Sequence, residues 1–345
     1  MEIKFFIGPM SKNIVDSIIE FQTESKNKIG LIPSRRQVDF NGGYANKWTT
    51  KGLSNYAKDL LIMRDHSGPG QGQTQDDGYE SLKHDCNHFD YIHIDPWKKF
   101  PSFSEGSRWT LDMIQFCFSI SPNIKFEIGT EEAIRQFEPE ELQSLLNYLK
   151  ANLPQEAFSQ IKYLVIQSGT SLSSNQNTGN FDLKRLKKMV AVAKQNNLKS
   201  KEHNGDYISE ELIKLKMDSG LDSINIAPEF GLIETDTYLN KMKKRRDLFD
   251  KFWQISYNSK KWVKWVSKDF DPIHQKESLI RVCGHYVFSD SEFLKDIKSE
   301  LSGIDQLIKI NIKKKLSSLH RMINPEGLQI NILDSFLQYF QAKYL

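Results

Sequence analysis

Short apolar runs, rich in β-branched residues, alternate along this chain with segments whose apolar positions recur at helical spacing. Continuous apolar runs are typical of parallel strands that are buried on both faces. The runs that predict strands are Ile3–Gly8, Ile29–Pro33, Leu60–Met63, Tyr91–Asp95, Lys125–Gly129, Tyr163–Gln167, Leu198–His203 and Ser223–Ala227. The intervening segments that most clearly predict helices are Asn13–Glu24, Glu140–Ala151, Leu183–Gln195 and Ser209–Ser219. The pattern therefore predicts a series of strand-then-helix units.

Eight such units match the count and length of a (β/α)8 barrel, the TIM barrel. Strand–helix alternation would also fit a doubly wound open sheet. Two observations disfavour the open sheet. Polar residues follow nearly every predicted strand rather than one switch point, and no GxGxxG motif follows the first strand. We therefore predict an α/β fold, a TIM barrel with a C-terminal helical extension.

The character of the sequence changes after the eighth unit. Residues 236–270 are dense in Lys, Arg and Trp, and the i, i+3 spacing of Trp262 and Trp265 predicts the buried face of an amphipathic closing helix. We expect a barrel domain over residues 1–270 and a mainly helical extension over residues 271–345. The extension would pack on the barrel or on a second subunit, and the sequence does not choose between them.

Composition narrows the class of protein without pointing to a function. The 345 residues carry a net charge of +3, an ordinary balance that predicts neither a nucleic-acid nor a membrane partner. The cysteines, Cys86, Cys117 and Cys283, are widely spaced and predict reduced thiols rather than disulfides. The apolar stretch at the start is too short for a signal peptide, and no run approaches the ~20 residues of a membrane helix. We expect a cytoplasmic protein.

Polar residues gather at the carboxyl ends of the predicted strands. In a barrel these ends meet at one mouth, where such folds carry out chemistry. The polar tips are Arg35-Arg36-Gln37, Arg64-Asp65-His66, His93-Ile94-Asp95, Glu127, Gln167, Glu202-His203-Asn204 and Asn225 with Glu229. Any function of the barrel is therefore expected among these residues.

His66, Glu127 and His203 each end a predicted strand, so a barrel would bring them together despite their separation in the sequence. Two imidazoles and a carboxylate suit a catalytic Zn²⁺ with an open coordination position. Asp65, beside His66, would move a proton once the metal had polarised a neighbouring oxygen. A histidine by itself is more often structural, and His93 could face either the barrel interior or the helices.

Further polar tips predict contacts to a substrate. The candidates for bonds to hydroxyl groups or to the metal ligands are Asp95, Asn204, Asp206, Asn225 and Glu229. Segment 34–49 holds Arg35, Arg36 and Gln37 and would suit an anionic or polyhydroxy ligand, although a surface loop explains it equally well. Lys201 shares a strand face with the predicted histidine ligand of the same strand. A Schiff-base lysine needs a desolvated pocket, and acidic neighbours argue against that role.

At these positions the chain resembles a known family. The motifs that carry the resemblance are QVDFNGGY (37–44), RDHSGP (64–69), YIHIDPW (91–97), FEIGTEE (126–132), VIQSGTSL (165–172), KEHNGDY (201–207) and INIAPEFG (224–231). They look like those of the class II D-tagatose-1,6-bisphosphate aldolase non-catalytic (Z-type) subunit, whose relatives include sugar-phosphate 4-epimerases. The family implies a TIM barrel related to the zinc-dependent class II aldolases.

The resemblance also implies roles for individual residues. It implies Asp65 as the catalytic acid/base, His66, Glu127 and His203 as metal ligands, and Asn225 as a substrate contact. Gln167 stands where the class II aldolases carry another zinc histidine, so it is a further candidate ligand or a sign of a different ligand set. The phosphate-binding signatures of the aldolases are absent, which leaves the phosphorylation of the substrate open.

The sequence thus leads to two functional hypotheses. The first is a zinc-dependent enzyme that epimerises or cleaves a ketose phosphate or related sugar through an enediolate or retro-aldol step. The second is a non-catalytic subunit that stabilises a partner tagatose-bisphosphate aldolase. The expected ligand is a small-molecule sugar or sugar phosphate. The expected assembly is a homo-oligomer or a complex with an aldolase subunit.

Overall fold

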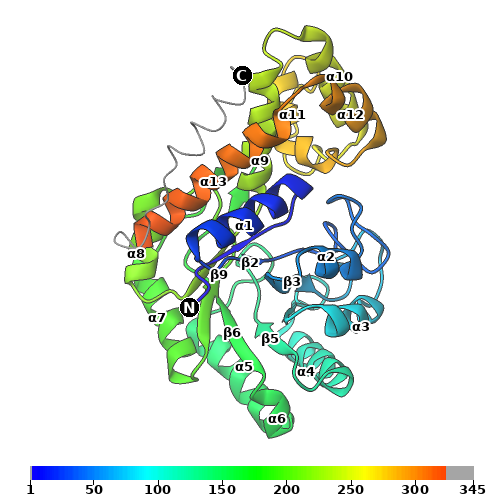
Figure 1. Cartoon of the computed structure of the whole chain (residues 1–345). Coiled ribbons are helices and arrows are strands. Elements are labelled where there is room, and N and C mark those ends of the chain that lie inside the picture. The colour runs from blue at the N-terminus through cyan, green and yellow to red at the C-terminus, as the bar shows by residue number, and fades with distance from the viewer. Residues whose placement is uncertain (1, 324–345) are drawn as a thin grey trace. The chain divides into compact units, whose positions relative to one another are not determined.

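Eight parallel strands form a closed barrel in the computed structural model, which describes residues 2–323 (Figure 1). The strands are β1 (Phe5–Ile7), β2 (Gly30–Leu31), β3 (Leu61–Ser67), β4 (Tyr91–Ile94), β5 (Lys125–Ile128), β6 (Ile161–Ile166), β9 (Lys199–Glu202) and β10 (Ser223–Ile226). They follow one another around the barrel in chain order, and β10 pairs with β1 to close it. The predicted TIM barrel is confirmed. A short hairpin of β7 (Leu172–Ser173) and β8 (Gln176–Asn177), which the sequence pattern did not predict, follows β6.

The chain divides into two compact units. The barrel unit comprises residues 2–10 and 29–229, and the helical unit comprises residues 11–28 and the described chain from residue 230. The expected boundary between residues 270 and 271 falls inside the helical unit. Residues 324–345 of the expected extension lie outside the described residues, and the packing of that extension stays a prediction.

Helices surround the strands of the barrel unit (Figure 1). They are α2 (Thr50–Tyr56), α3 (Tyr79–His88), α4 (Phe103–Ile120), α5 (Pro139–Asn152), α6 (Gln155–Phe158), α7 (Leu183–Gln195) and α8 (Glu210–Asp218). Side-chain caps define where several begin. Ser102, Asp182 and Ser209 accept hydrogen bonds from backbone N–H groups in the first turns of α4, α7 and α8. These caps fix the residues at which α4, α7 and α8 begin.

An apolar cluster fills part of the barrel interior. Its buried members are Ile3, Phe6, Ile32, Met63 and Tyr163. The rings of Phe6 and Tyr163 meet edge to face with centroids 5.8 Å apart. A Cβ atom on Gly30 would lie 2.3 Å from the Phe6 ring, so only glycine lets this ring occupy the interior. The cluster gives the polar groups on the same strands a dry environment.

A buried ion pair joins β9 to α8 on the outside of the barrel. Lys216 is fully buried, and its ammonium contacts Oε2 of Glu202 and, at 2.8 Å, the hydroxyl of Ser168. Oε1 of Glu202 accepts the N–H of Ser168 at 3.1 Å. Because side chains alternate along a strand, this outward direction of Glu202 turns its neighbours Lys201 and His203 into the barrel.

Replacing Lys216 by methionine is expected to destabilise the protein by about 3–5 kcal/mol, because it leaves the Glu202 carboxylate buried without its cation. Chemical denaturation measures the change. Lys214→Met is the matched control, since Lys214 on the same helix forms only an exposed pair with Asp218 at 2.8 Å. That variant should change stability by less than about 1 kcal/mol. Equal effects of the two substitutions would contradict the assigned role of the buried pair.

The helical unit contains helices from both ends of the chain. They are α1 (Lys12–Ser25), most of α9 (Pro228–Lys241), α10 (Arg246–Asn258), α11 (Lys276–Cys283), α12 (Ser291–Asp296) and α13 (Ile304–Ile323). Helix α1 packs along α13, and Glu20 of α1 pairs with Lys309 of α13 at 2.6 Å. No helix within residues 2–323 has the length and apolar character needed to span a bilayer.

The closing helix predicted around Trp262 and Trp265 does not form. Residues 260–270 are turns, because Lys260 adopts a φ of 56°, in the left-handed region, directly after α10 ends. The indole N–H of Trp262 donates to the carbonyl of Tyr257 at 3.0 Å, and the two rings stack with centroids 5.8 Å apart. Both tryptophans are half-buried against α11, so the predicted aromatic face packs on the protein from turns instead of from a helix.

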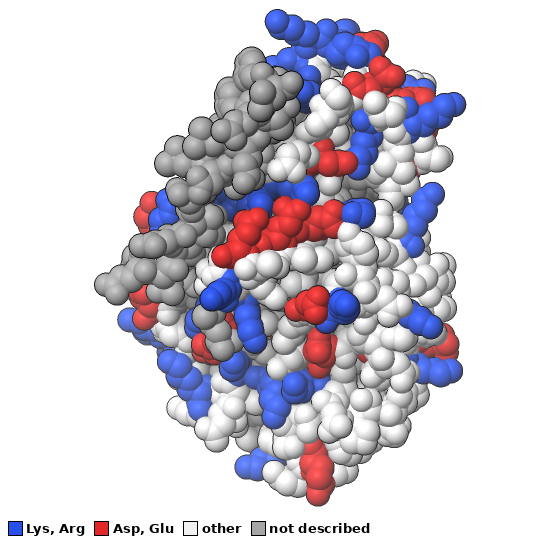
Figure 2. All heavy atoms as spheres, in the orientation of Figure 1, with Lys and Arg blue, Asp and Glu red and all other residues white. Residues whose placement is uncertain are grey.

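Charged side chains of both signs are interspersed over the face of the molecule drawn in Figure 2. This mixture agrees with the near balance of 47 basic and 44 acidic residues.

A buried carboxyl group links three helices of the helical unit. Glu234 on α9 is 1% exposed and accepts hydrogen bonds from the hydroxyl of Ser11 and, at 2.9 Å, from the amide of Asn13. The same Asn13 amide donates to Asp305 at 2.9 Å, and Asp305 pairs with Lys298 at 2.8 Å. Burial outweighs these bonds and raises the pKa of Glu234 to about 7. The carboxyl group is therefore more easily accommodated with its proton than without it.

The free energy of unfolding should fall as the pH rises between the pKa of Glu234 in the unfolded chain and its higher pKa in the folded chain. Within this range the unfolded chain loses the Glu234 proton while the folded chain still keeps it. That range extends from the ordinary value of 4.5 to about 7. The full loss is on the order of 3 kcal/mol. Urea denaturation at several pH values measures it, and Glu234→Gln should remove this part of the dependence. Glu20→Gln, at a half-buried ion pair on α1, should leave it in place, and an unchanged profile in Glu234→Gln would refute the assignment.

Candidate metal centre at the barrel mouth

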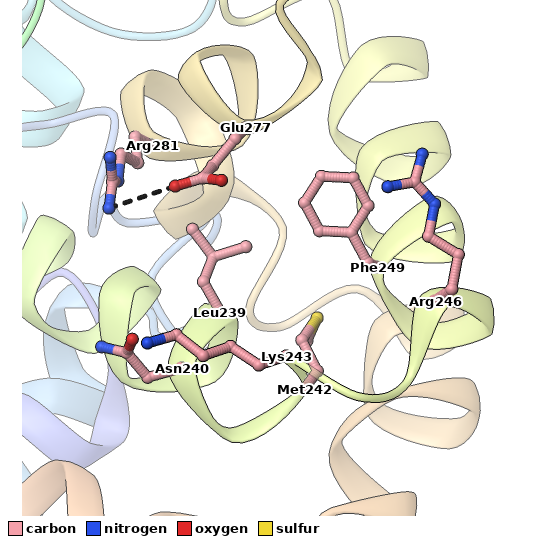
Figure 3. Close-up of a pocket in the computed structure, with 8 residues that line it drawn as sticks. All are labelled: Leu239, Asn240, Met242, Lys243, Arg246, Phe249, Glu277 and Arg281. Atoms are coloured by element: carbon pink, nitrogen blue, oxygen red, sulfur yellow. Dashed lines mark ion pairs between the residues drawn. The ribbon is translucent and has the colours of Figure 1, made fainter.

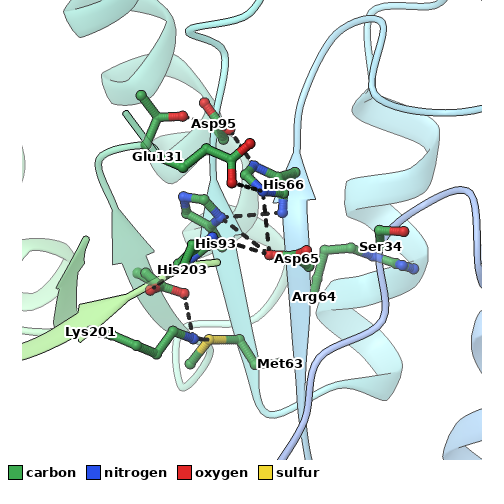
Figure 4. A network of polar contacts seen from close by, with 12 residues as sticks. Ser34, Met63, Arg64, Asp65, His66, His93, Asp95, Glu131, Lys201 and His203 are labelled. Carbon is green, nitrogen blue, oxygen red and sulfur yellow. Dashed lines mark hydrogen bonds and ion pairs between the residues drawn. The ribbon is translucent and has the colours of Figure 1, made fainter. Parts of the chain in front are cut away.

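The third strand ends in an irregular turn that directs two neighbouring side chains into the barrel mouth. On a regular strand Asp65 and His66 would point to opposite faces. The pairing of β3 with β4 shifts register between Arg64 and Ser67, and His66 has a φ of 46°. Such bulges re-aim side chains and are frequent near active sites. Arg64 points outward to Asp85 on α3, at 2.7 Å, while the two residues after it face the mouth (Figure 4).

Three imidazole rings surround one carboxylate oxygen, Oδ1 of Asp65 (Figure 4). This oxygen lies 3.7 Å from Nε2 of His66, 3.9 Å from Nδ1 of His93 and 3.6 Å from Nδ1 of His203. This oxygen and the three imidazole nitrogens all lie within 4.8 Å of one another. Ligand atoms bound 2.0–2.1 Å from a tetrahedral zinc are about 3.3 Å apart, so the spacing is close to that of a metal site.

Each ring is held through its other nitrogen by a buried acceptor. The pairs are Nδ1 of His66 with Asp95 at 2.6 Å, Nε2 of His203 with Glu127 at 3.2 Å, and Nε2 of His93 with the carbonyl of Gly129 at 2.9 Å. A proton on the held nitrogen leaves the lone pair of the other nitrogen facing the centre. In His93 that second nitrogen also accepts the backbone N–H of His66 at 3.2 Å. Carboxylate and carbonyl partners orient metal-binding histidines in this way.

The electrostatic field at the centre favours positive charge. Burial opposes ionisation of His66, but Asp65 and Asp95 outweigh it and raise the pKa of His66 to about 10. Burial likewise disfavours the charged form of Asp65, but His66, His93 and His203 together lower the pKa of Asp65 well below its usual range. A field that favours a proton so strongly would also favour a bound metal cation. Three imidazole nitrogens beside a carboxylate are a donor set that suits Zn²⁺.

Two of the predicted metal ligands lie outside this group. Glu127 is fully buried, and its two oxygens contact Lys201 at 2.8 Å and the held nitrogen of His203. The Lys201 ammonium and, after it, His203 and His93 outweigh burial and lower the pKa of Glu127 to about 2. Glu127 therefore contacts His203, a candidate metal ligand, and does not itself reach the point where the three imidazole nitrogens converge. The amide of Gln167 is engaged by backbone groups of residues 130–137 at 2.8–2.9 Å.

Two residues of the centre were missed or left open at the level of sequence. His93 faces the mouth, and the signal was present, because Asp95 two residues later lies on the same face of β4. Glu131 was not selected. Its Oε2 lies 3.9 Å from Nε2 of His66 and accepts the amide N–H of Asn204 at 2.7 Å. The centre thus has a second carboxylate beside the ligand atoms, oriented by a predicted substrate residue.

Asn225 on β10 is available to a ligand. Its side chain is 6% exposed, and neither its amide nitrogen nor its amide oxygen has a hydrogen-bond partner among residues 2–323. Buried amide groups without partners are rare, because losing water without a replacement bond costs free energy. A ligand hydroxyl group would supply that bond. Lys201, by contrast, is fully buried against Glu127, and burial lowers its pKa.

Two of the three predicted contacts on the loop after β2, Arg35 and Gln37, have side-chain partners among residues 2–323. Arg35 is 1% exposed and pairs with Asp39 at 3.0 Å and with Asp76 at 2.6 Å. Gln37 accepts the backbone N–H of Ser34 at 2.8 Å. These side chains hold the loops after β2 and β3 in place, so they shape the mouth without facing its centre.

The predicted contacts near β10 also bind backbone groups. One oxygen of Asp206 accepts the N–H groups of Ala227 and Glu229 at 2.9 and 2.8 Å. The carboxylate of Glu229 accepts the N–H of Tyr207 at 2.9 Å. These bonds join the loop after β9 to the end of β10, and so they fix the strand end that carries Asn225.

A pocket of about 370 Å³ in the helical unit lacks comparable chemistry (Figure 3). Arg281, on its wall, pairs with Glu277 at 3.2 Å and with Asp236 at 2.8 Å. Arg246 pairs with Asp250 at 3.0 Å. Its charges are therefore largely neutralised by neighbours, and we assign it no function.

Solved structures share the barrel fold. Neither a protein-family model nor a curated protein matches this chain. A protein described as a probable tagatose 6 phosphate kinase from Sinorhizobium meliloti 1021 superposes with a TM-score of 0.74, 14% identity and 98% coverage of each chain. For fructose-bisphosphate aldolase from Campylobacter jejuni the TM-score is 0.60 at 11% identity, over 94% of this chain and 90% of that one. For the YdjI aldolase from Escherichia coli K12 it is 0.52 at 12% identity, over 88% and 92%. Identities this low show a common fold, so the function must be argued from the site.

His93→Ala is expected to weaken zinc binding by at least 10- to 100-fold, because it removes one of the converging nitrogens. Glu127→Gln should weaken it less, by loosening the hold on His203. Gln167→Ala should leave it unchanged. Calorimetric titration of zinc into chelator-treated protein measures all three, with circular dichroism as the check on folding. If His93→Ala still binds zinc tightly and Gln167→Ala loses zinc binding, this ligand set is wrong and the set expected from the sequence is supported.

Proposed function

We propose that this protein is a zinc-dependent enzyme of the class II aldolase type that cleaves or epimerises a ketose phosphate or related sugar. The observation that carries the proposal is the convergence of three imidazole nitrogens on Asp65 Oδ1, each ring being held from behind by an acceptor. Sugar-phosphate enzymes and aldolases appear by name among the structures that share the fold. These names support the proposed substrate class.

A bound zinc ion would polarise a substrate carbonyl and stabilise the negative charge that develops on its oxygen. Asp65 would move the proton. Its Oδ1 would accept the proton of a substrate hydroxyl group, whose oxygen becomes a carbonyl as the neighbouring carbon–carbon bond breaks. The electron pair of that bond remains on the fragment that holds the original carbonyl. Rejoining the fragments after the new aldehyde has turned, with return of the proton from Asp65 to the re-formed hydroxyl oxygen, would give the epimer. Transfer of that proton to the carbanion, followed by release of both fragments, would complete an aldol cleavage.

The surrounding residues would position the sugar. Asn225 would exchange hydrogen bonds with a hydroxyl group, since both halves of its buried amide lack partners within residues 2–323. Glu131, held by Asn204, would accept a hydrogen bond from a second hydroxyl beside His66. Such contacts place the scissile bond next to the proton acceptor.

One observation favours the alternative role, a non-catalytic Z-type subunit of a tagatose-bisphosphate aldolase. The amide of Gln167 is occupied by backbone groups, and the resemblance in sequence implies that this residue replaces a zinc histidine of the class II aldolases. A purely structural subunit, however, has no need of His66, His93 and His203 arranged around Asp65. Co-purification with an aldolase, and loss of that aldolase's stability without this chain, would support the alternative.

Asp65→Asn is expected to lower kcat by about 10²- to 10⁴-fold, because the amide cannot accept the hydroxyl proton. Zinc content should remain close to that of the wild type. The assay follows aldehyde release and epimer formation from a panel of ketose phosphates and unphosphorylated ketoses.

His84→Ala is the matched control, because His84 lies on α3 and contacts Phe40 and Glu80. It should keep full activity. An Asp65→Asn variant as active as the wild type would remove Asp65 from the mechanism. A wild-type protein that binds zinc but turns over no member of the panel would favour the subunit role.

A further inference from the structure

Two cationic side chains flank the candidate metal centre. Arg36 follows β2 and lies two residues beyond Ser34, which forms a β-bridge with Asp65. Lys98 follows β4 and lies three residues beyond Asp95, the carboxylate that holds His66. Arg36 is half-buried and Lys98 is exposed. Both therefore emerge from strand ends on the mouth side of the barrel.

The two charges are close enough to influence each other. The pKa of Lys98 is lowered by partial burial and then by the charge of Arg36, whereas Asp95 and Glu131 act in the opposite direction. Lys98 thus lies within the electrostatic reach of Arg36 on one side and of the carboxylates of the mouth on the other. Two neighbouring cations repel, and an anion between them would remove that repulsion.

Neither cation is neutralised by a side chain in the part of the chain that the structure describes. Among residues 2–323, the side chains of Arg36 and Lys98 form no hydrogen bond or ion pair. Four other arginines of the barrel unit are paired with carboxylates, namely Arg35 with Asp76, Arg64 with Asp85, Arg135 with Glu141 and Arg185 with Glu138, whereas Arg108 on α4 has no such pair among residues 2–323. The contrast with Arg35, the adjacent residue in the sequence, is the sharpest. Arg35 is paired with carboxylates of the loops after β2 and β3, whereas the guanidinium of Arg36 has no hydrogen-bond acceptor among residues 2–323.

We propose that Arg36 and Lys98 form an oxyanion subsite, which binds a phosphate or carboxylate group of the substrate at the edge of the mouth. This inference rests on the proposed function, because it supplies the anionic end of the same sugar. The centre itself is rich in carboxylates, including Asp65, Asp95 and Glu131, and these would repel an anionic substrate. Cations at the rim would offset that repulsion and hold the anionic group away from the metal ligands.

The two residue types suit this task. The planar guanidinium of Arg36 can donate two parallel hydrogen bonds to an oxyanion, and the ammonium of Lys98 adds a mobile point charge. Because Arg36 and Lys98 approach from different strand ends, the anion would be held between them. The carbon chain of the sugar would then extend from the rim toward Asp65 and Asn225.

The test titrates inorganic phosphate into the full-length protein, as purified and after chelation of divalent metal, at constant ionic strength. Calorimetry measures the affinity, with sodium acetate as the carboxylate probe in a second series. Arg36→Gln and Lys98→Gln should each weaken phosphate binding about tenfold, the effect of losing one charge-assisted contact. Lys99→Gln is the matched control, because Lys99 lies beside Lys98 and its ammonium is 5.7 Å from the Phe100 ring. Its affinity should stay within about twofold of the wild type.

The outcomes separate the possibilities. Stronger binding of phosphate than of acetate assigns the subsite to a phosphate group, and the reverse order assigns it to a carboxylate. Absence of binding by the wild type, or equal affinity in the wild type, Arg36→Gln and Lys98→Gln, overturns the proposal. So does a loss in Lys99→Gln equal to that in Lys98→Gln.

Zinc titration of the same variants keeps this test distinct from that of the proposed function. Arg36→Gln and Lys98→Gln should bind zinc as the wild type does, because neither side chain contacts the histidines. If zinc binding fails in the wild type while phosphate binding still depends on Arg36, the proposed function falls and the anion subsite stands. If zinc binds and phosphate does not, the subsite falls alone.

Discussion

The hydrogen bond that each mouth histidine makes with a buried acceptor is the interaction on which the candidate centre depends. Asp95, Glu127 and the carbonyl of Gly129 hold one nitrogen of each ring, and the other nitrogen then faces Asp65. Without these partners the rings could rotate and point either nitrogen at the centre. The arrangement therefore determines both the direction of the rings and the nitrogen that can bind a metal.

One of these acceptors, Glu127, is itself held in place by a buried ion pair. Lys201 lies inside the barrel against Glu127, while the neighbouring Glu202 points outward to Lys216 on α8. Removing two opposite charges from water is costly unless they meet with good geometry, so such pairs restrict the register and direction of the strand that carries them. The alternation along β9 thus connects the outer helix to the position of His203.

The centre and its rim have opposite electrostatic character. The carboxylates around the histidines favour a cation, as the raised pKa of His66 shows. Arg36 and Lys98 sit farther along the loops after β2 and β4 and carry positive charge without a partner in the described chain. A ligand with hydroxyl and carbonyl oxygens at one end and an oxyanion at the other would match both regions. A ketose phosphate has this distribution.

The sequence by itself determined the barrel and most of the polar tips, because strand–helix alternation and burial on both faces leave a local pattern. Asp65, His66 and His203 lie together at the mouth, and the sequence predicts this proximity because closure of a barrel gathers all strand ends. Tertiary structure alone decided which of the meeting residues face the centre. The bulge after Arg64 turns His66 inward, and the carbonyl of Gly129, just after β5, orients His93. The loop after β5 engages Gln167. These outcomes depend on backbone register and on contacts between distant segments, and neither leaves a periodic trace in the order of residues.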